Sequence, residues 1–245
     1  MDFTDKIAVV TGAGQGLGRC ITAALAARGA KVAILGRTLA KLEAVAREID
    51  GDIVPIQADV SDPAAVAEAF RRIEGARGRI DILVNNAGLI DIFRVSDSDP
   101  TTIVDQIGAN LVGPILCSRA AIPLLKASGG GTIVNISTMC VSRVYPRLAV
   151  YTATKAGLEN FSEGLRAELK PDNIHVAVLR LGTMISEGPR DYDMIQTRAF
   201  LADCAAAGID AYTRPPMDMS TVAESLMSIL STPLNARINL LDLVN

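Results

Sequence analysis

The sequence predicts an α/β protein in which helices cover both faces of a parallel β-sheet. Short apolar runs alternate along the chain with longer amphipathic ones, and the short runs carry apolar residues on both faces of the expected strands. The 245 residues are 49% hydrophobic, which is enough for one large core. We therefore expect a single domain over residues 1–245, with helices on both faces of a seven-stranded parallel sheet.

The expected elements follow one another in strand–helix order. Strands are expected at Lys6–Thr11, Lys31–Leu35, Asp52–Gln57, Ile80–Asn85, Gly131–Ile136, Ile174–Leu179 and Ile238–Leu243. Helices are expected at Leu17–Arg28, Leu39–Ile49, Ala64–Ala76, Thr101–Ala127 and Val150–Leu169. The glycine-containing segments 75–79 and 128–131 are expected to be connections between elements.

Residues 186–216 interrupt this alternation. They are polar, rich in Arg, Asp and Ala, and contain Pro189 and the pair Pro215-Pro216. They follow the sixth strand at the carboxyl edge of the sheet, where open parallel sheets bind ligands. We expect a mobile, partly helical substrate lid. The alternative is a structural insertion that has no role in function.

Composition excludes several classes of function. The net charge is −3, the sequence pI is about 5.3 and no basic run stands out, so nucleic acid is not an expected partner. The N-terminus lacks a signal-peptide pattern and no apolar run is long enough for a bilayer, so we expect a cytoplasmic protein without a membrane partner. His175 is the only histidine, which removes His-based triads and most catalytic zinc sites, and we expect no metal.

A glycine-rich segment, TGAGQGLG at residues 11–18, follows the first strand and opens the first helix. Glycines allow a tight turn and a close backbone approach to a pyrophosphate, which then lies at the helix N-terminus. Although the glycine spacing differs from GxGxxG, its position between a strand and a helix indicates a dinucleotide site. The candidate residues are Gly12, Gln15, Gly16, Leu17 and Gly18.

The end of the second strand indicates which dinucleotide is bound. An acid about 20 residues past the glycines would hold the ribose 2′-hydroxyl of NAD. The strand instead ends in Gly36-Arg37-Thr38, where Arg37 and Thr38 suit a 2′-phosphate, so NADP(H) is favoured and NAD(H) is the alternative. The alternative interpretation of Arg37 is a solvated residue in the first turn of the helix that binds no ligand. Asp59 and Val60, after the third strand, are candidates for the adenine.

Tyr151 and Lys155 stand four residues apart at the start of an expected helix, so their side chains share one face. A cation near a phenol favours the phenolate and lowers the phenol's pKa towards the range of a general acid or base. The spacing alone is common, and a helix surface with one aromatic residue would also produce it. The surrounding motifs decide between the two readings.

Together these motifs resemble the short-chain dehydrogenase/reductase family in its single-domain form, over about Lys6 to Gly182 and more weakly beyond. The resemblance rests on TGAGQGLG, NNAG (Asn85–Gly88), Asn110 in the long helix, a hydroxyl residue after the fifth strand, and Tyr151-x-x-x-Lys155. It implies a Rossmann-type doubly wound sandwich that transfers hydride between a nicotinamide and a carbonyl carbon.

The resemblance also implies roles for individual residues. Tyr151 would be the general acid in reduction or base in oxidation, and Lys155 would bind the nicotinamide ribose and lower the pKa of Tyr151. Asn110 would hold a water in a proton relay. The cofactor would be lined by Asn86, Ala87 and Gly88. Members often pair through the long helices, so a homodimer or homotetramer is expected.

Two positions depart from the family pattern. Members usually carry a serine thirteen residues before the tyrosine, and this chain has Thr138 there, with Ser137 one position earlier. We assign Thr138 the carbonyl-binding hydroxyl, because a shift of one residue on a strand points to the opposite face. After the sixth strand, Leu181 of Arg180-Leu181-Gly182-Thr183 replaces the usual proline, and Ser186 stands where a carboxamide-binding threonine is common. Gly182 and Thr183 remain candidates for cofactor contacts.

The expected substrate pocket is mostly apolar, which suits a small, partly hydrophobic carbonyl or secondary alcohol. Its wall is expected to include Leu89, Ile90, Phe93, Met139, Cys140, Val141 and Tyr145. Five arginines in nearby segments either receive an anionic substrate or are surface residues; they are Arg94, Arg143, Arg147, Arg190 and Arg198.

The resulting hypothesis is an NADPH-dependent ketoreductase whose catalytic residues are Asn110, Thr138, Tyr151 and Lys155. An NAD-dependent alcohol dehydrogenase and a non-catalytic dinucleotide-binding regulator are the alternatives.

Overall fold

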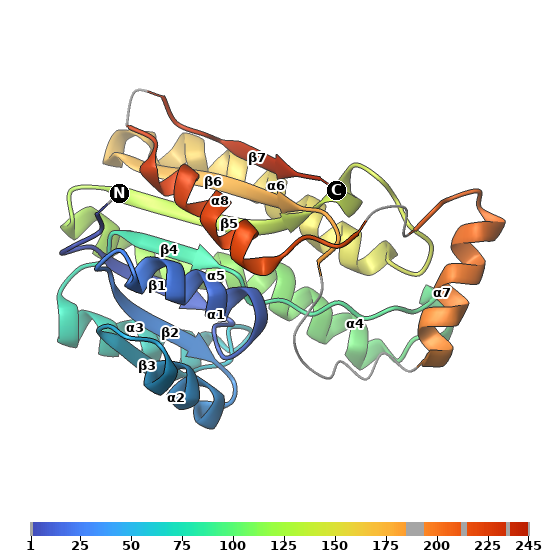
Figure 1. The fold of residues 1–245 in the computed structure, drawn as a ribbon, viewed down its shortest axis with the longest axis horizontal. Coiled ribbons are helices and arrows are strands. Elements are labelled where there is room, and N and C mark those ends of the chain that lie inside the picture. The colour runs from blue at the N-terminus through green and yellow to red at the C-terminus, as the bar shows by residue number, and fades with distance from the viewer. Residues whose placement is uncertain (1, 185–193, 212–214, 234–235, 245) are drawn as a thin grey trace.

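The computed structural model describes residues 2–184, 194–211, 215–233 and 236–244, whose strands form one seven-stranded sheet (Figure 1). The strand order is β3-β2-β1-β4-β5-β6-β7, and every neighbouring pair is parallel. The chain builds outward from β1 to β3 and then returns to the other side of β1, so the strand order reverses between β1 and β4. The expected Rossmann-type doubly wound sheet is therefore confirmed, and its ligand crevice lies at this switch point.

The strands are β1 (Ile7–Thr11), β2 (Lys31–Gly36), β3 (Ile53–Gln57), β4 (Ile82–Asn85), β5 (Gly131–Thr138), β6 (Ile174–Leu181) and β7 (Leu240–Leu243). The central strands are buried on both faces, as their continuous apolar runs predict. Successive residues of one strand point to opposite faces of the sheet and enter different cores, as Ile133 and Val134 of β5 do.

Two helical layers cover the sheet. One apolar core joins a face of the sheet to α1 (Gly16–Ala26), α2 (Leu39–Glu48) and α8 (Met219–Ser231). The other core joins the opposite face to α3 (Pro63–Arg77), α5 (Gly113–Ala127) and α6 (Ala149–Leu169). Helix α7 (Met194–Ala206) stands apart from both layers, at the right end of the molecule in Figure 1.

The expected helix 101–127 is divided into three parts. It begins as α4 (Pro100–Ile107), continues through a π-helical turn, η2 (Gly108–Val112), and ends as α5. The whole stretch is long and apolar enough to span a membrane by length and composition alone. Residues Cys117, Ala121 and Leu125 of α5 are instead fully buried in the second core, which is the packing of a core helix.

Two helix boundaries correct the sequence interpretation. Helix α3 runs through Gly75 to Arg77, so the connection expected at 75–79 begins only at Gly78, whose φ of 70° ends the helix. Helix α8 was not expected, although the sequence contains its signals. Asp218 caps it by accepting a hydrogen bond from the Ser220 amide at 2.7 Å, and its inner face is apolar.

Strands β5 and β6 extend two residues beyond their predicted ends, to Thr138 and Leu181. Leu181 pairs with Thr138 on one side and with Leu243 on the other. A proline at position 181 would lack the amide proton that a strand residue can donate, so the departure from the family pattern is compatible with the longer strand.

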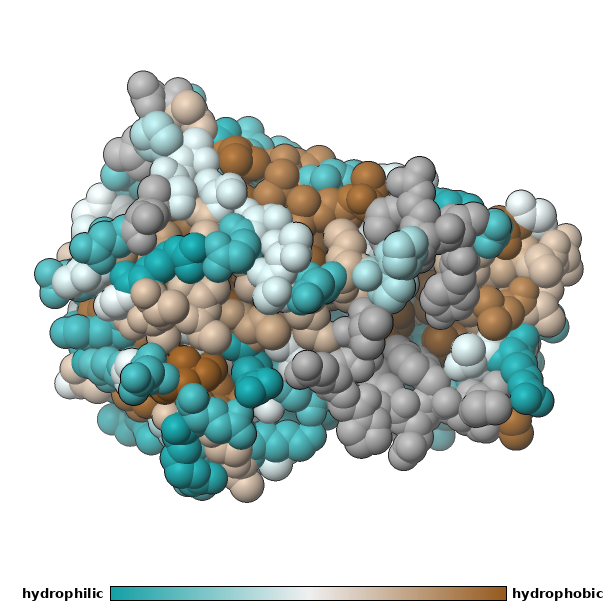
Figure 2. Space-filling view, in the orientation of Figure 1, coloured by the Kyte–Doolittle hydropathy of each residue, from teal (hydrophilic) through white to brown (hydrophobic). Residues whose placement is uncertain are grey.

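Apolar side chains reach the surface shown in Figure 2 over β7 and at the right end, around α7. Leu240 of β7 and Ile195 of α7 are exposed apolar residues of these two elements. Of the lid expected at 186–216, α7 and the segments 207–211 and 215–216 are described, which confirms a helical part. Ser186, Pro189 and Arg190 lie outside the described residues.

Candidate active site

A cavity of about 720 Å³ lies at the carboxyl ends of β1, β2, β4, β5 and β6. Its lining extends from Arg37 and Asp59, after β2 and β3, to Tyr151 and Phe200, on α6 and α7. Among the predicted cofactor-binding and catalytic residues, only the buried Asn110 is absent from the lining. The fold therefore brings together residues from the whole length of the described chain at the sheet's switch point.

The glycine-rich turn is packed too closely for side chains at two of its positions. A Cβ on Gly18 would lie 2.4 Å from the Gly12 carbonyl oxygen, and one on Gly12 would lie 2.8 Å from the Ala87 Cα. Gly12 and Gly16 also have φ values of 66° and 57°, in the left-handed region that favours glycine. Helix α1 begins here without an acid in its first turn and without a side-chain cap. These features fit a pyrophosphate-binding cradle at a helix N-terminus.

The predicted residue Asn86 supports this cradle from the next loop. Its side-chain amide donates hydrogen bonds to the carbonyls of Thr11 at 2.9 Å and Gly12 at 3.3 Å. The Thr11 hydroxyl in turn accepts the amide protons of Asn86 and Ala87, both at 3.0 Å. The NNAG segment and the glycine-rich turn are thus one hydrogen-bonded unit.

The far end of the cavity carries cations after β2. Arg37 is exposed at the strand end, and Thr38 precedes α2 without a side-chain capping bond, as a residue that faces a ligand would. Lys41, which the sequence interpretation missed, also lines the cavity and donates a hydrogen bond to the Gln15 side chain at 2.7 Å. Its signal was a cation one turn into the helix that follows β2. Asp59 accepts hydrogen bonds from the Ser61 hydroxyl and amide.

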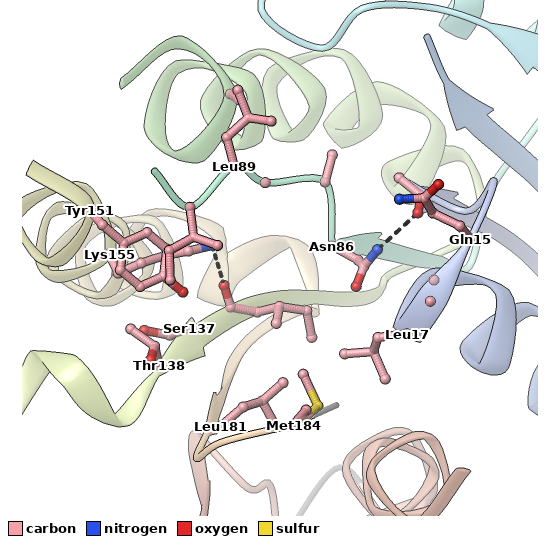
Figure 3. Close-up of a pocket in the computed structure, with 18 of the residues that line it drawn as sticks. Gln15, Leu17, Asn86, Leu89, Ser137, Thr138, Tyr151, Lys155, Leu181 and Met184 are labelled. Atoms are coloured by element: carbon pink, nitrogen blue, oxygen red, sulfur yellow. Dashed lines mark hydrogen bonds between the residues drawn. The ribbon is translucent and has the colours of Figure 1, made fainter. Parts of the chain in front are cut away.

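Tyr151 and Lys155 lie one turn apart on α6, with both side chains over the end of β5 (Figure 3). The Lys155 ammonium is buried and donates a hydrogen bond to the Ile136 carbonyl at 2.9 Å. Burial lowers the pKa of Lys155 to about 8, so it remains mostly charged at neutral pH. The position of Gly88 is beside it, since a Cβ there would lie 3.6 Å from Nζ.

The neighbouring hydroxyls of Thr138 and Ser137 have different partners. Thr138 accepts the Cys140 amide proton at 3.3 Å, which orients its side chain and leaves the hydroxyl proton to donate. Ser137 donates to the Glu159 carboxylate at 2.6 Å. Figure 3 shows both below the phenol oxygen of Tyr151. Ser137 thus already has a protein partner, which favours Thr138 as the residue whose hydroxyl would bind the substrate. Burial raises the pKa of the adjacent Cys140 thiol, so this thiol stays protonated.

The side chain of Asn110 is completely buried in the π-helical turn. It accepts the Leu89 amide proton and donates to the Leu89 carbonyl, both at 2.7 Å, and also contacts the Thr154 hydroxyl at 3.3 Å. One turn earlier, Gln106 accepts the Asp91 amide proton at 2.6 Å. The π turn therefore holds the loop after β4 against the catalytic helix.

Beyond Tyr151 the cavity is apolar. Tyr145, Leu148, Phe200 and Cys204 form a third buried cluster, with Ile90 and Ile92 packed against it. Of the wall residues expected from sequence, Leu89, Ile90, Met139, Cys140 and Tyr145 line the cavity, whereas Val141 and Phe93 do not. The lining residues that were missed include Ile92, Leu148, Met184, Thr197, Phe200 and Ala211.

Three of the arginines near this end have protein partners. Arg94 and Arg147 both bind Asp203 of α7, with shortest distances of 2.7 and 2.6 Å. Their hydrogen bonds hold the pKa of Asp203 below its usual range. Arg143 donates to the Asp210 carbonyl at 2.9 Å and lies over the Tyr145 ring. These contacts tie α7 to the two loops that line the apolar end.

A doubly wound parallel sheet with a glycine cradle at its switch point, and with a buried lysine beside a phenol in the same cavity, defines an NAD(P)-dependent oxidoreductase. The family model described as short chain dehydrogenase matches residues 6–192. The chain is 30% identical to an uncharacterized oxidoreductase of Staphylococcus aureus (strain N315), over 97% of this chain and 96% of that protein. The chain belongs to the short-chain dehydrogenase/reductase family.

Two solved structures are also similar over nearly their full lengths. One is a 3-ketoacyl-(acyl-carrier-protein) reductase from Brucella melitensis complexed with NADH, with a TM-score of 0.85 and 28% identity over 99% of this chain and 98% of that one. The other is a metagenomic short-chain oxidoreductase in complex with NADP, with a TM-score of 0.82 and 26% identity over 98% and 97%. Both cofactor types therefore occur among similar structures.

Proposed function

We propose that the protein is an NADP(H)-dependent ketoreductase, which interconverts a small, partly hydrophobic ketone and its secondary alcohol. The observation that carries this proposal is the meeting of Thr138, Tyr151 and Lys155 at the apolar end of the cavity that contains the glycine cradle. An acid–base group, a carbonyl-binding hydroxyl and a dinucleotide site are the parts that reversible carbonyl reduction requires.

Each polar group has a task in this reaction. Thr138 donates a hydrogen bond to the carbonyl oxygen and holds it beside Tyr151. Tyr151 gives its phenolic proton to that oxygen as negative charge develops there, and takes a proton back in the oxidative direction. The nicotinamide supplies the hydride when it is bound. Lys155, which is charged below a pH of about 8, stabilises the phenolate that remains.

Asn110 is proposed to hold a water between Lys155 and solvent, so that the proton Tyr151 has lost is replaced. Its side chain contributes by fixing Leu89 and the loop that contains Gly88. A Cβ on Gly88 would lie 3.0 Å from the Asn110 side-chain oxygen and 3.6 Å from Lys155 Nζ, so a larger residue there would fill the space beside the ammonium.

The preference for NADP(H) rests on the cations at the adenosine end. Arg37 and Lys41 flank this part of the cavity, and no acid is present at the end of β2 to repel a 2′-phosphate. The bond between Lys41 and Gln15 links this cation to the glycine-rich turn. The Asp59 carboxylate, also in the lining, belongs to the next strand and is bonded to Ser61.

The substrate end favours an uncharged ketone. Its described wall is formed mostly by aliphatic and aromatic side chains, and Arg94 and Arg147, which share Asp203, do not line the cavity. Thr138 and Tyr151 are the polar groups that orient the carbonyl within this apolar surrounding.

The function is tested by following NADPH oxidation with a panel of alicyclic and aryl ketones. Wild type is expected to turn over at least one class, and Tyr151→Phe is expected to lose activity at least ~100-fold because the general acid is gone. Cofactor titration by fluorescence controls for folding, since the variant should bind NADPH as wild type does. Unchanged turnover by Tyr151→Phe would contradict the assigned role, and no turnover of any ketone by wild type would contradict the function.

A further inference from the structure

An ion pair next to the catalytic residues is not explained by the roles above. Arg180, on β6, contacts the Glu159 carboxylate of α6 through two nitrogens, at 2.6 and 3.1 Å. Its third nitrogen donates to Asp242 of β7 at 3.0 Å. The side chains of Arg180 and Glu159 are only 15% and 17% exposed, so this forked contact is mostly shielded from water.

Ser137 connects this pair to β5. Its hydroxyl donates to the same Glu159 oxygen that the Arg180 Nε approaches. Ser137 directly precedes Thr138. It follows Ile136, whose carbonyl accepts a hydrogen bond from the Lys155 ammonium. Three consecutive residues of β5 therefore have three tasks. Ile136 is hydrogen-bonded to Lys155, Ser137 is hydrogen-bonded to Glu159, and Thr138 presents the hydroxyl that binds the substrate.

Helix α6 presents these groups in one row. Tyr151, Lys155 and Glu159 are each four residues apart, so they lie on the same face of the helix. Lys155 and Glu159 are hydrogen-bonded to successive residues of β5, and these two bonds fix the position of the helix along that strand. Because Tyr151 lies one turn before Lys155, the same register sets the position of its phenol relative to Thr138.

We infer that Glu159 and Arg180 are a positioning pair, which fixes the catalytic helix against the ends of β5 and β6 and thereby aligns Tyr151 with Thr138. This inference rests on the proposed function. Neither residue lines the cavity, so the pair acts through Ser137 and through the helix. Arg180 also directly precedes Leu181, Gly182 and Thr183, which do line the cavity, so the pair steadies that wall as well.

The pair also determines the charge near Lys155. The ionised groups of this cluster are Glu159 on α6, one turn after Lys155, Arg180 on β6 and Asp242 on β7, and Tyr151 is the titratable residue one turn before Lys155. The groups that β5 and the π turn contribute here are uncharged: the Ile136 carbonyl, which is bonded to Lys155, the Ser137 hydroxyl, which is bonded to Glu159, and the Asn110 amide, which is bonded to Thr154. Removing either partner therefore changes the net charge of the cluster by one unit of known sign.

The test compares Glu159→Gln, Arg180→Gln and the double variant in NADPH-dependent ketone reduction. Wild-type activity is expected to fall as the pH rises through about 8, where Lys155 loses its proton. Glu159→Gln removes one negative charge and leaves Arg180 paired with Asp242 alone, which disfavours the ammonium and moves this alkaline limb of the pH profile to lower pH. Arg180→Gln leaves Glu159 negative and moves the limb to higher pH. Each single variant is expected to lower kcat about tenfold through misalignment.

The double variant is expected to restore the wild-type limb, because the net charge of the cluster is then the same as in wild type, with Asp242 as the remaining ion, and to recover kcat in part. A readout independent of turnover is the phenolate absorbance of the cofactor-free protein, with Tyr151→Phe as the subtraction. The Tyr151 phenol should titrate at lower pH in Glu159→Gln and at higher pH in Arg180→Gln. Arg28→Gln, which breaks the distant pair between Arg28 and Glu224, is the control and should leave kcat and the limb unchanged.

A purely structural role predicts something different. Both single variants would then lose thermal stability. The folded fraction, counted by cofactor binding, would keep the wild-type kcat and the wild-type fall in activity with rising pH, and this result would overturn the inference. If either variant fails to fold, Ser137→Ala decides, because it removes only the link to β5. A several-fold lower kcat in this variant supports the inference, and wild-type kcat overturns it. In all of these outcomes wild type remains active, whereas failure of the proposed function would show as an inactive wild type.

Discussion

The two ends of the cavity are built in different ways. At the cofactor end, the glycine cradle and the NNAG segment interact through backbone groups and two short side chains, Thr11 and Asn86. At the substrate end, the wall consists of side chains from the loop after β4, the segment after β5, and α7, joined by apolar packing and by the Asp203 ion pairs. A site made from backbone depends on short motifs at fixed places in the fold. A pocket made from side chains depends on how distant segments pack.

The proposed catalytic residues lie where these two kinds of construction meet. Lys155 is anchored to a backbone carbonyl, as at the cofactor end, whereas Thr138 and Tyr151 present side chains to the apolar end. This difference predicts that changes at the cofactor end alter cofactor choice, and that changes at the substrate end alter KM for the ketone alone.

The largest effect on a KM is expected at the cofactor end, from Arg37→Asp. It replaces a cation by an acid beside the site of the 2′-phosphate, and a charge-assisted bond is worth about 1.5–3 kcal/mol. The KM for NADPH should rise about 10- to 100-fold, and the ratio of NADPH to NADH use should fall accordingly. Steady-state kinetics with both cofactors measure this. Lys41→Gln should shift the ratio less, and an unchanged ratio in Arg37→Asp would remove Arg37 from cofactor selection.

A smaller effect is expected at the substrate end, from Asp203→Asn. This change leaves Arg94 and Arg147 without their shared carboxylate and loosens α7 from the rim. Ion pairs near the surface contribute little because water screens them, so the KM for the ketone should rise only about fivefold while the KM for NADPH stays constant. Added salt should raise the wild-type KM towards that of the variant. Asp172→Asn, which breaks a distant pair with Lys126, is the control. A parallel rise in the KM for NADPH would contradict the separation of the two ends.

The smallest effect is expected where the ends meet, from Thr138→Ser. The hydroxyl and its bond to the Cys140 amide are retained, and only the methyl group and the restriction of χ1 are lost. Turnover should change by less than about threefold. Thr138→Val, which keeps the shape but lacks the hydroxyl, should lose about 10²–10³-fold, as loss of one donor to a developing oxyanion does. Equal rates in the Ser and Val variants would show that the hydroxyl at 138 is not used.

Much of the fold could be predicted because local patterns agree with the tertiary structure. The buried strands read as apolar runs, and the glycine-rich segment lies where a strand meets a helix, so the sheet and the cofactor cradle follow from spacing. Helix α8 was missed even though Asp218 and its apolar face signal it, because it follows an irregular polar segment. The continuation of α3 through Gly75 was missed because one glycine in a helix costs only about 1 kcal/mol against alanine.

The sequence by itself determined the class of sheet, and it predicted the dinucleotide cradle and the Tyr151–Lys155 pair, because these depend on residue types at short, fixed spacings. Thr138 was predicted from the resemblance to the family. The tertiary structure alone decided that Ser137 belongs to Glu159 and that Arg94 and Arg147 belong to Asp203. It also placed Arg180 between α6 and β7. These partners are far apart in the chain, so their pairing depends on the packing of whole elements, which no local spacing specifies.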